Sequence, residues 1–172
     1  VQPNGTRQGV RPRTRWQRKD QLAEDGTGII FGLGTGRCGT TSLANLLNAQ
    51  PGTTCFHELN PSSMAWEGAE ATIGSLMRDF IAILEGGHRE VTADLVAPNR
   101  LAPLPRLRSL EQVHALGDVA SYYLPYVPTM LRRWRGLRFP CLRRNRDEVV
   151  ASFADKLSQP AHLPPRNHFS SA

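Results

Sequence analysis

The fold is decided by residues 28–42, which read GIIFGLGTGRCGTTS. The stretch opens with a short apolar run, IIFGL, which is typical of a buried strand in a parallel sheet. Gly34, Gly36 and Gly39 then predict a tight turn, and the hydroxyl residues after them predict the start of a helix. In such a turn the backbone N–H groups converge and the helix dipole adds partial positive charge. We therefore predict a phosphate-binding loop, the alternative being a tight turn that binds nothing.

The rest of the chain alternates apolar runs with amphipathic segments. Helical spacing predicts a helix from Thr40 with Leu43, Leu46 and Leu47 on its apolar face. Further strands are predicted at 53–56, 113–116 and 137–142, and further helices at 61–84, 122–134 and 147–157. Glycine pairs and prolines predict a long surface loop over 86–108. This alternation indicates an α/β fold with a parallel sheet.

Length and composition are those of one globular domain. The chain has 172 residues, of which 40% are hydrophobic and 21% charged. We expect a flexible basic arm over 1–25, an α/β nucleotide-binding domain over 26–158 and an irregular tail over 159–172. Three scattered cysteines are too few for a disulfide framework or a zinc cluster, so we expect a cytoplasmic protein without a metal site.

The net charge of +6 comes almost entirely from arginine, which supplies 19 of the 21 basic residues. Guanidinium groups match phosphate and sulfate oxygens, which suits an anionic ligand. The charge gathers in the first 25 residues and again over 132–146, and the alternatives for these clusters are a solvated surface or a nucleic-acid partner. The longest stretch free of charge, Cys38 to His57, is too polar to span a membrane.

The glycine-rich turn resembles the 5′-phosphosulfate-binding loop of sulfotransferases, which use 3′-phosphoadenosine 5′-phosphosulfate (PAPS) as sulfuryl donor. The resemblance implies nucleotide contacts from Gly36, Arg37, Cys38, Gly39, Thr40, Thr41 and Ser42. Cys38 stands where serine is commoner in that family. Gly34 and Gly39 also match the spacing of nucleotide triphosphatases, but Thr40 replaces the lysine that reaches the terminal phosphates. A P-loop kinase or triphosphatase is therefore the alternative, and the nucleic-acid binder ranks third.

A second motif supports the resemblance. Arg144 follows the apolar segment 137–142, and Ser152 lies eight residues beyond Arg144. This pair is similar to the family's 3′-phosphate-binding motif, in which an arginine and a serine hold the 3′-phosphate of PAPS. Arg143 and Arg146 remain alternatives to Arg144.

The resemblance also implies a general base. Glu58 matches the position of the base glutamate of protein-tyrosine sulfotransferases, and His57 is the runner-up because imidazole titrates near neutral pH. Arg37 would stabilise charge on the oxygen between sulfate and 5′-phosphate. Asp118 and Ser121 are interpreted either as substrate groups or as caps of the following helix.

Taken together, the resemblance implies a P-loop-like three-layer α/β/α fold. It implies transfer of a sulfuryl group from PAPS to a hydroxyl or amine, leaving 3′-phosphoadenosine 5′-phosphate (PAP) and requiring no metal. The acceptor is left open among carbohydrate, peptide, lipid and small alcohol, as is the oligomeric state. Family members usually continue well past the second motif, so we expect a short member, a truncated chain or a domain completed by another chain.

Overall fold

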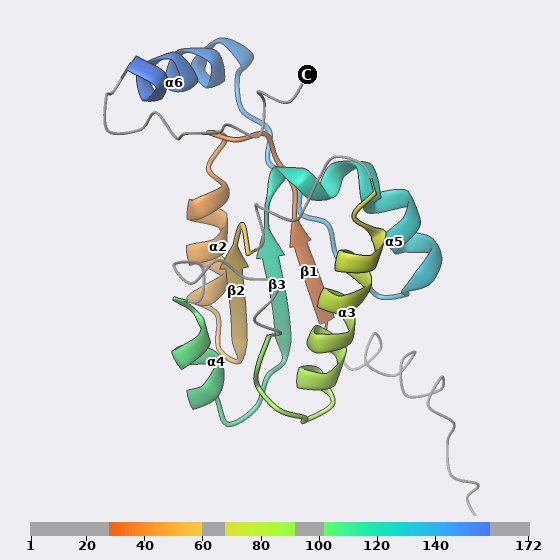
Figure 1. Ribbon diagram of the computed structural model, residues 1–172. Helices are drawn as coiled ribbons and strands as arrows, with labels where there is room; N and C mark the ends of the chain where they lie inside the picture. The colour runs from red at the N-terminus through yellow and green to blue at the C-terminus, as the bar shows by residue number, and fades with distance from the viewer. Residues whose placement is uncertain (1–27, 60–67, 92–101, 159–172) are drawn as a thin grey trace, which may run out of the picture.

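The computed structural model describes residues 28–59, 68–91 and 102–158 of the chain. These residues form a mixed α/β fold around a small parallel sheet (Figure 1). Its strands are β1 (Gly28–Gly32), β2 (Thr53–His57) and β3 (Ala115–Val119), and they lie in the order β1-β3-β2. Phe31 of β1 and Phe56 of β2 both pair with Asp118 of β3, so all three strands end at the same edge. The predicted parallel sheet is confirmed. The predicted arm 1–25 and tail 159–172 lie outside the described residues.

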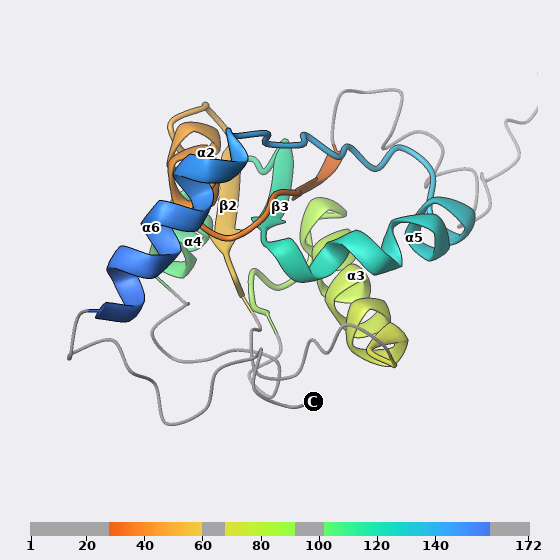
Figure 2. The same ribbon diagram turned by 90° about the horizontal axis from the view of Figure 1, so that it is seen from above.

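The two faces of the sheet carry different helices. Helix α2 (Thr40–Asn48) packs through Ala44 on one face, against Cys55 and Val119. Helix α3 (Glu70–Leu84) packs on the other face, and Figure 2 shows α2 and α3 on opposite sides of the strands. The apolar stripe predicted for the first helix was partly wrong, since Leu46 is 61% exposed. Leu43, Ala44 and Leu47 turn to the sheet instead, because these three positions lie on one side of the helix.

An extended segment prolongs the sheet beyond β1. Residues 137–142 were predicted to form a strand, and they make isolated parallel bridges, Ile30 with Arg138 and Leu33 with Cys141. The two bridges keep one register, with backbone hydrogen bonds on both sides of Pro140. Pro140 lacks the N–H that a continuous ladder needs at that point. The segment is therefore interrupted, although it follows the path of a strand.

Prolines caused the clearest errors of the sequence interpretation. The predicted loop 86–108 contains helix α4 (Leu104–Ser109), whose first turn includes Pro105. The predicted helix 122–134 is divided into a 3-10 helix, η3 (Ser121–Tyr126), and helix α5 (Val127–Arg133) with Pro128 in its first turn. Proline is compatible with the first turn of a helix because the N–H it lacks has no partner there. It marks helix starts here, and not only loops.

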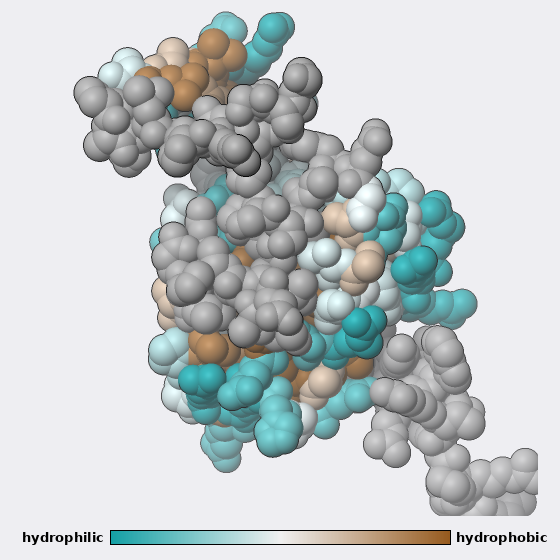
Figure 3. Space-filling view, in the orientation of Figure 1, coloured by the Kyte–Doolittle hydropathy of each residue, from teal (hydrophilic) through white to brown (hydrophobic). Residues whose placement is uncertain are grey.

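The last helix, α6 (Arg146–Ser158), extends beyond the strands' carboxyl ends on the α2 side (Figures 1 and 2). The predicted helix is confirmed, but none of its residues is buried. Val150 and Leu157 are 58% and 49% exposed. Figure 3 shows apolar surface on α6. Among the described residues, no helix has the length and apolar character needed to cross a bilayer.

Candidate anion-binding site

The glycine-rich turn leads directly from β1 into α2, as the sequence predicts. Gly39 precedes the helix with φ +101°, a conformation that residues with a Cβ rarely adopt. A glycine has no side chain with which to cap the helix, and the first turn, Thr40 to Ser42, contains no acid. The amino end of α2 therefore presents N–H donors and a positive dipole end without a counter-charge from its own first turn.

His57 lies against this first turn. It is the last residue of β2, and its Nε2 lies 3.0 Å from Oγ1 of Thr40 and 3.4 Å from Oγ1 of Thr41. Thr40 is buried and Thr41 is exposed, so the imidazole bridges an inner and an outer hydroxyl of the loop. The structure thus brings together His57 and two of the predicted loop residues.

Glu58 lies at the turn directly after β2. Its φ is 50°, in the left-handed region, and its N–H donates to the carbonyl of Val119 at 3.1 Å. The residue is half-buried. Both candidate bases therefore lie at the carboxyl edge of the sheet, where ligands bind in open α/β folds, and His57 is in direct contact with the loop.

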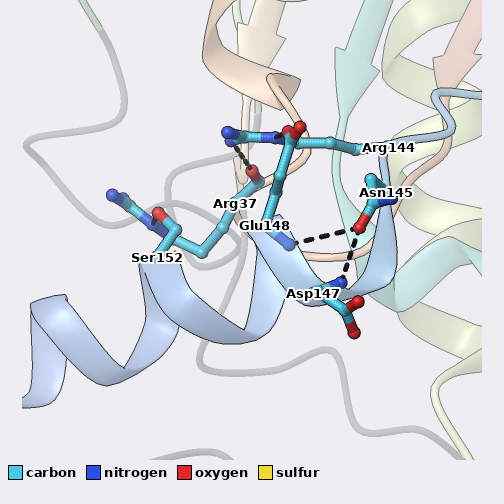
Figure 4. Close-up of polar contacts among 6 residues, drawn as sticks. All are labelled: Arg37, Arg144, Asn145, Asp147, Glu148 and Ser152. Carbon is cyan, nitrogen blue, oxygen red and sulfur yellow. Dashed lines mark hydrogen bonds and ion pairs between the residues drawn. The ribbon is translucent and has the colours of Figure 1, made fainter.

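The second motif meets the loop at α6, as Figure 4 shows. Nε of Arg37 donates to Oγ of Ser152 at 2.9 Å, and Nη1 of Arg144 donates to the carbonyl of Arg37 at 3.0 Å. Arg37 has φ 68°, which turns its carbonyl into the position that Arg144 reaches. Arg37 is therefore a neighbour in space of Arg144 and Ser152, which lie 107 and 115 positions further along the chain.

Two further contacts fix this junction. Asn145 caps α6, since its Oδ1 accepts from the N–H groups of Asp147 at 2.8 Å and Glu148 at 3.4 Å (Figure 4). A Cβ at Gly36 would lie 2.8 Å from Cζ of Phe153, so the ring packs directly on this glycine and a larger residue would displace it. Sequence reasoning missed both contacts. The Asn145 cap was visible as an asparagine before a helix, but the Gly36–Phe153 contact was not.

Arg144 is held by a carboxylate as well as by the loop. Its Nε donates to Oε2 of Glu148 at 2.8 Å, and Glu148 lies in the first turn of α6, four residues further along the chain. Both side chains are partly exposed. The junction thus contains two guanidinium groups, one hydroxyl and one carboxylate, and the sequence interpretation had not included the carboxylate.

Asp118 belongs to the core and not to the site surface. It is completely buried, and its Oδ2 accepts from the hydroxyls of Tyr123 at 2.7 Å and Tyr122 at 3.2 Å and from the N–H of Leu59 at 3.1 Å. Burial raises its pKa to about 6, although these donors oppose the shift. Neither Asp118 nor Ser121 supplies a side-chain cap to η3, so the capping interpretation was wrong. Asp118 ties β3 to the segment that follows Glu58.

Two of the cysteines have clear structural surroundings. The Sγ of Cys38 packs beside Gly34, where a Cβ would lie 2.5 Å from it, and the loop's N–H of Cys38 donates to the carbonyl of Thr35 at 3.3 Å. Cys55 is buried on the α2 face, where burial and the charge of Asp118 raise the pKa of its thiol. Within the described residues, no cluster of histidine, cysteine and acid side chains suited to a metal ion is present.

Comparisons of the chain with protein-family models, with curated proteins and with solved structures found no match. The geometry of the site is therefore the basis on which a function is assigned.

Proposed function

We propose that this chain is a sulfotransferase that moves a sulfuryl group from PAPS to an acceptor hydroxyl or amine. The observation that carries the proposal is the meeting of two motifs at one corner of the fold. The loop after β1 and the start of α6 are joined by Arg37, Arg144 and Ser152. A nucleotide with phosphate groups at both its 5′ and 3′ positions needs two such anion-binding elements side by side.

The loop is suited to the 5′-phosphosulfate. The first-turn N–H groups of α2 and the hydroxyls of Thr41 and Ser42 are exposed at a helix start that carries no acid. Gly36, Cys38, Gly39 and Thr40 would complete this contact surface. We assign these residues to donor binding. The thiol of Cys38 is a weaker donor than the serine hydroxyl that is commoner at this position, so the contact there would rest on backbone N–H groups of the loop.

The junction with α6 is suited to the 3′-phosphate. Arg144 lies two residues before α6 and reaches the loop, and Ser152 lies on α6 itself. Charge-assisted hydrogen bonds from a guanidinium to phosphate oxygens are among the stronger polar contacts in proteins. Arg37 now donates to Ser152. A role at the oxygen between sulfate and 5′-phosphate would require this side chain to leave Ser152 when the donor binds.

We assign proton removal from the acceptor to Glu58 or His57. Both follow β2 at the carboxyl edge of the sheet, and His57 contacts two loop hydroxyls. A base at this position needs to lie within hydrogen-bond reach of the acceptor oxygen or nitrogen. We also propose that the sheet is the middle layer of a P-loop-like three-layer fold, which the packing of α2 and α3 on opposite faces supports. A cytoplasmic location accords with the free thiols of Cys38, Cys55 and Cys141.

Thermal unfolding in the presence of ligands tests donor class. We expect PAP to raise the melting temperature and ATP with magnesium to leave it unchanged, because Thr40 stands where a triphosphatase has lysine. Stabilisation by ATP–magnesium alone would replace the proposal with a P-loop kinase or triphosphatase.

A labelled-sulfate transfer assay over carbohydrate, peptide, lipid and small-alcohol acceptors tests the reaction. We expect Glu58→Ala or His57→Ala to abolish turnover while PAP still stabilises the protein, which would identify the base. Full turnover in both base variants would remove the assignment.

A further inference from the structure

The carboxylate of Glu148 competes with the proposed phosphate ligand for the guanidinium group of Arg144. A guanidinium carries five N–H donors. The Nε of Arg144 is engaged by Oε2 of Glu148 at 2.8 Å, and one donor of Nη1 by the carbonyl of Arg37 at 3.0 Å. Among the described residues, no hydrogen bond uses the remaining donors on Nη1 and Nη2, so they can be offered to a ligand. A phosphate bound there would lie beside the Glu148 carboxylate on the same guanidinium.

We propose that Glu148 is a specificity-determining residue that orients Arg144 and sets how tightly the junction holds a phosphate; the inference rests on the proposed function. The carboxylate does two things of opposite sign. As an acceptor it fixes the guanidinium against the loop carbonyl, which prepares the site. As a negative charge it repels a phosphate dianion and lowers the affinity for any ligand that places one at this corner.

The repulsion from Glu148 should weaken the binding only of ligands that carry a 3′-phosphate. PAP carries phosphates at both the 5′ and 3′ positions, whereas adenosine 5′-phosphate carries only the one assigned to the loop. Glu148 forms its ion pair with Arg144, the residue assigned to the 3′-phosphate, so we expect its charge to act mainly on that phosphate. Its side chain is 59% exposed and that of Arg144 is 42% exposed, so solvent screens the repulsion and the effect is of modest size.

Asp147 provides a matched control. It is an acid in the same first turn of α6, one residue before Glu148, and its N–H is likewise capped by Asn145. Figure 4 shows its carboxylate pointing away from Arg144. Asp147→Asn therefore removes the same charge from the same helix start without changing the contacts of Arg144.

Isothermal titration of the full chain with PAP and with adenosine 5′-phosphate tests the proposal. We expect Glu148→Gln, which keeps an acceptor oxygen and loses the charge, to raise the ratio of PAP affinity to adenosine 5′-phosphate affinity by about threefold, the scale of a screened charge pair. Asp147→Asn should leave the ratio unchanged. Glu148→Ala should bind PAP less tightly than Glu148→Gln, because Arg144 then loses its orienting partner. Thermal unfolding without ligand checks that all variants are folded.

The outcomes separate this inference from the proposed function. A wild-type protein that binds PAP, with a ratio that does not rise in Glu148→Gln or that rises equally in Asp147→Asn, overturns the role of Glu148 alone. A folded wild-type protein that does not bind PAP overturns the proposed function and this inference with it.

Discussion

Helices α3 and α6 have similar lengths, 15 and 13 residues, but opposite relations to the sheet. The interior of α3 fills one face of the sheet, and its buried residues are Ile73, Leu76, Met77, Phe80 and Ile83. Helix α6 buries no residue and contacts the loop through polar groups and one aromatic ring. Helix α3 supports the fold, whereas α6 supplies groups to the site. Stability and binding should therefore respond to mutations in different helices.

The largest expected effect is a difference in the free energy of unfolding between a phenylalanine mutated in α3 and one mutated in α6. Phe80 is fully buried, with its ring centroid 6.2 Å from that of Phe31 and 6.3 Å from that of Phe56. We expect Phe80→Ala to lower the free energy of unfolding by about 3–5 kcal/mol, through lost burial and a cavity. Phe153→Ala, on α6, should cost about 1 kcal/mol or less, because this ring is only partly buried. Urea titration measures both, and equal losses would contradict the division of roles.

The second prediction concerns the buried acid beneath the site. Burial raises the pKa of Asp118 from 3.8 to about 6, so the folded chain holds its proton more tightly than the unfolded chain. The stabilisation by protonation is fully present below about pH 4 and is lost as pH rises through about 6. The shift corresponds to about 2–3 kcal/mol, at 1.36 kcal/mol per pKa unit.

Asp118→Asn removes this titration. We expect the free energy of unfolding of the wild-type protein, relative to the variant, to fall between about pH 4 and pH 6 and to be level above about pH 7. Urea titrations over this range measure the difference. A difference that does not depend on pH would show that Asp118 titrates alike in the folded and unfolded chains.

A smaller effect compares a glycine of the loop that α6 contacts with a glycine of α3. Gly39, at the start of α2, has φ +101° and open space around a Cβ, so Gly39→Ala should cost about 1–2 kcal/mol through backbone strain alone. Gly74 lies within α3, and a Cβ there would meet only the end of the Arg78 side chain, at 3.7 Å. Gly74→Ala should therefore stabilise the protein by about 0.5–1 kcal/mol. Thermal unfolding measures whether each variant is less or more stable than the wild-type protein. An unchanged stability in Gly39→Ala would show that the loop does not require glycine at this position.

The sequence predicts those parts of the fold that depend on local patterns. The apolar run before the loop was sufficient to predict β1, and the helical spacing was sufficient to predict α3. Both patterns record directly which faces of the element are buried. Helix α4 was missed because Pro103 and Pro105 were interpreted as loop residues. The exposure of α6 could not be predicted, because an apolar stripe does not indicate what covers it.

The sequence could predict which residues of the site carry charged or hydroxyl groups, but not how the elements that hold them pack together. Arg37, Arg144 and Ser152 were selected from two separate motifs, and the structure places them in contact. The Glu148 contact and the ring of Phe153 on Gly36 depend on how α6 docks on the loop, which is a tertiary property. The burial of Asp118 likewise depends on Tyr122 and Tyr123 folding back over β3.

The most direct test of the central claim is the affinity of Arg144→Ala for PAP and for adenosine 5′-phosphate, measured by calorimetry. If the loop and α6 form one nucleotide site, Arg144→Ala should weaken PAP binding by about tenfold or more, the scale of a lost charged hydrogen bond, and leave adenosine 5′-phosphate binding nearly unchanged. Arg146→Ala, at the exposed first residue of α6, is the control and should change neither affinity by more than about twofold. Equal weakening of both ligands by Arg144→Ala, or a wild-type protein that binds PAP no better than adenosine 5′-phosphate, would contradict the claim.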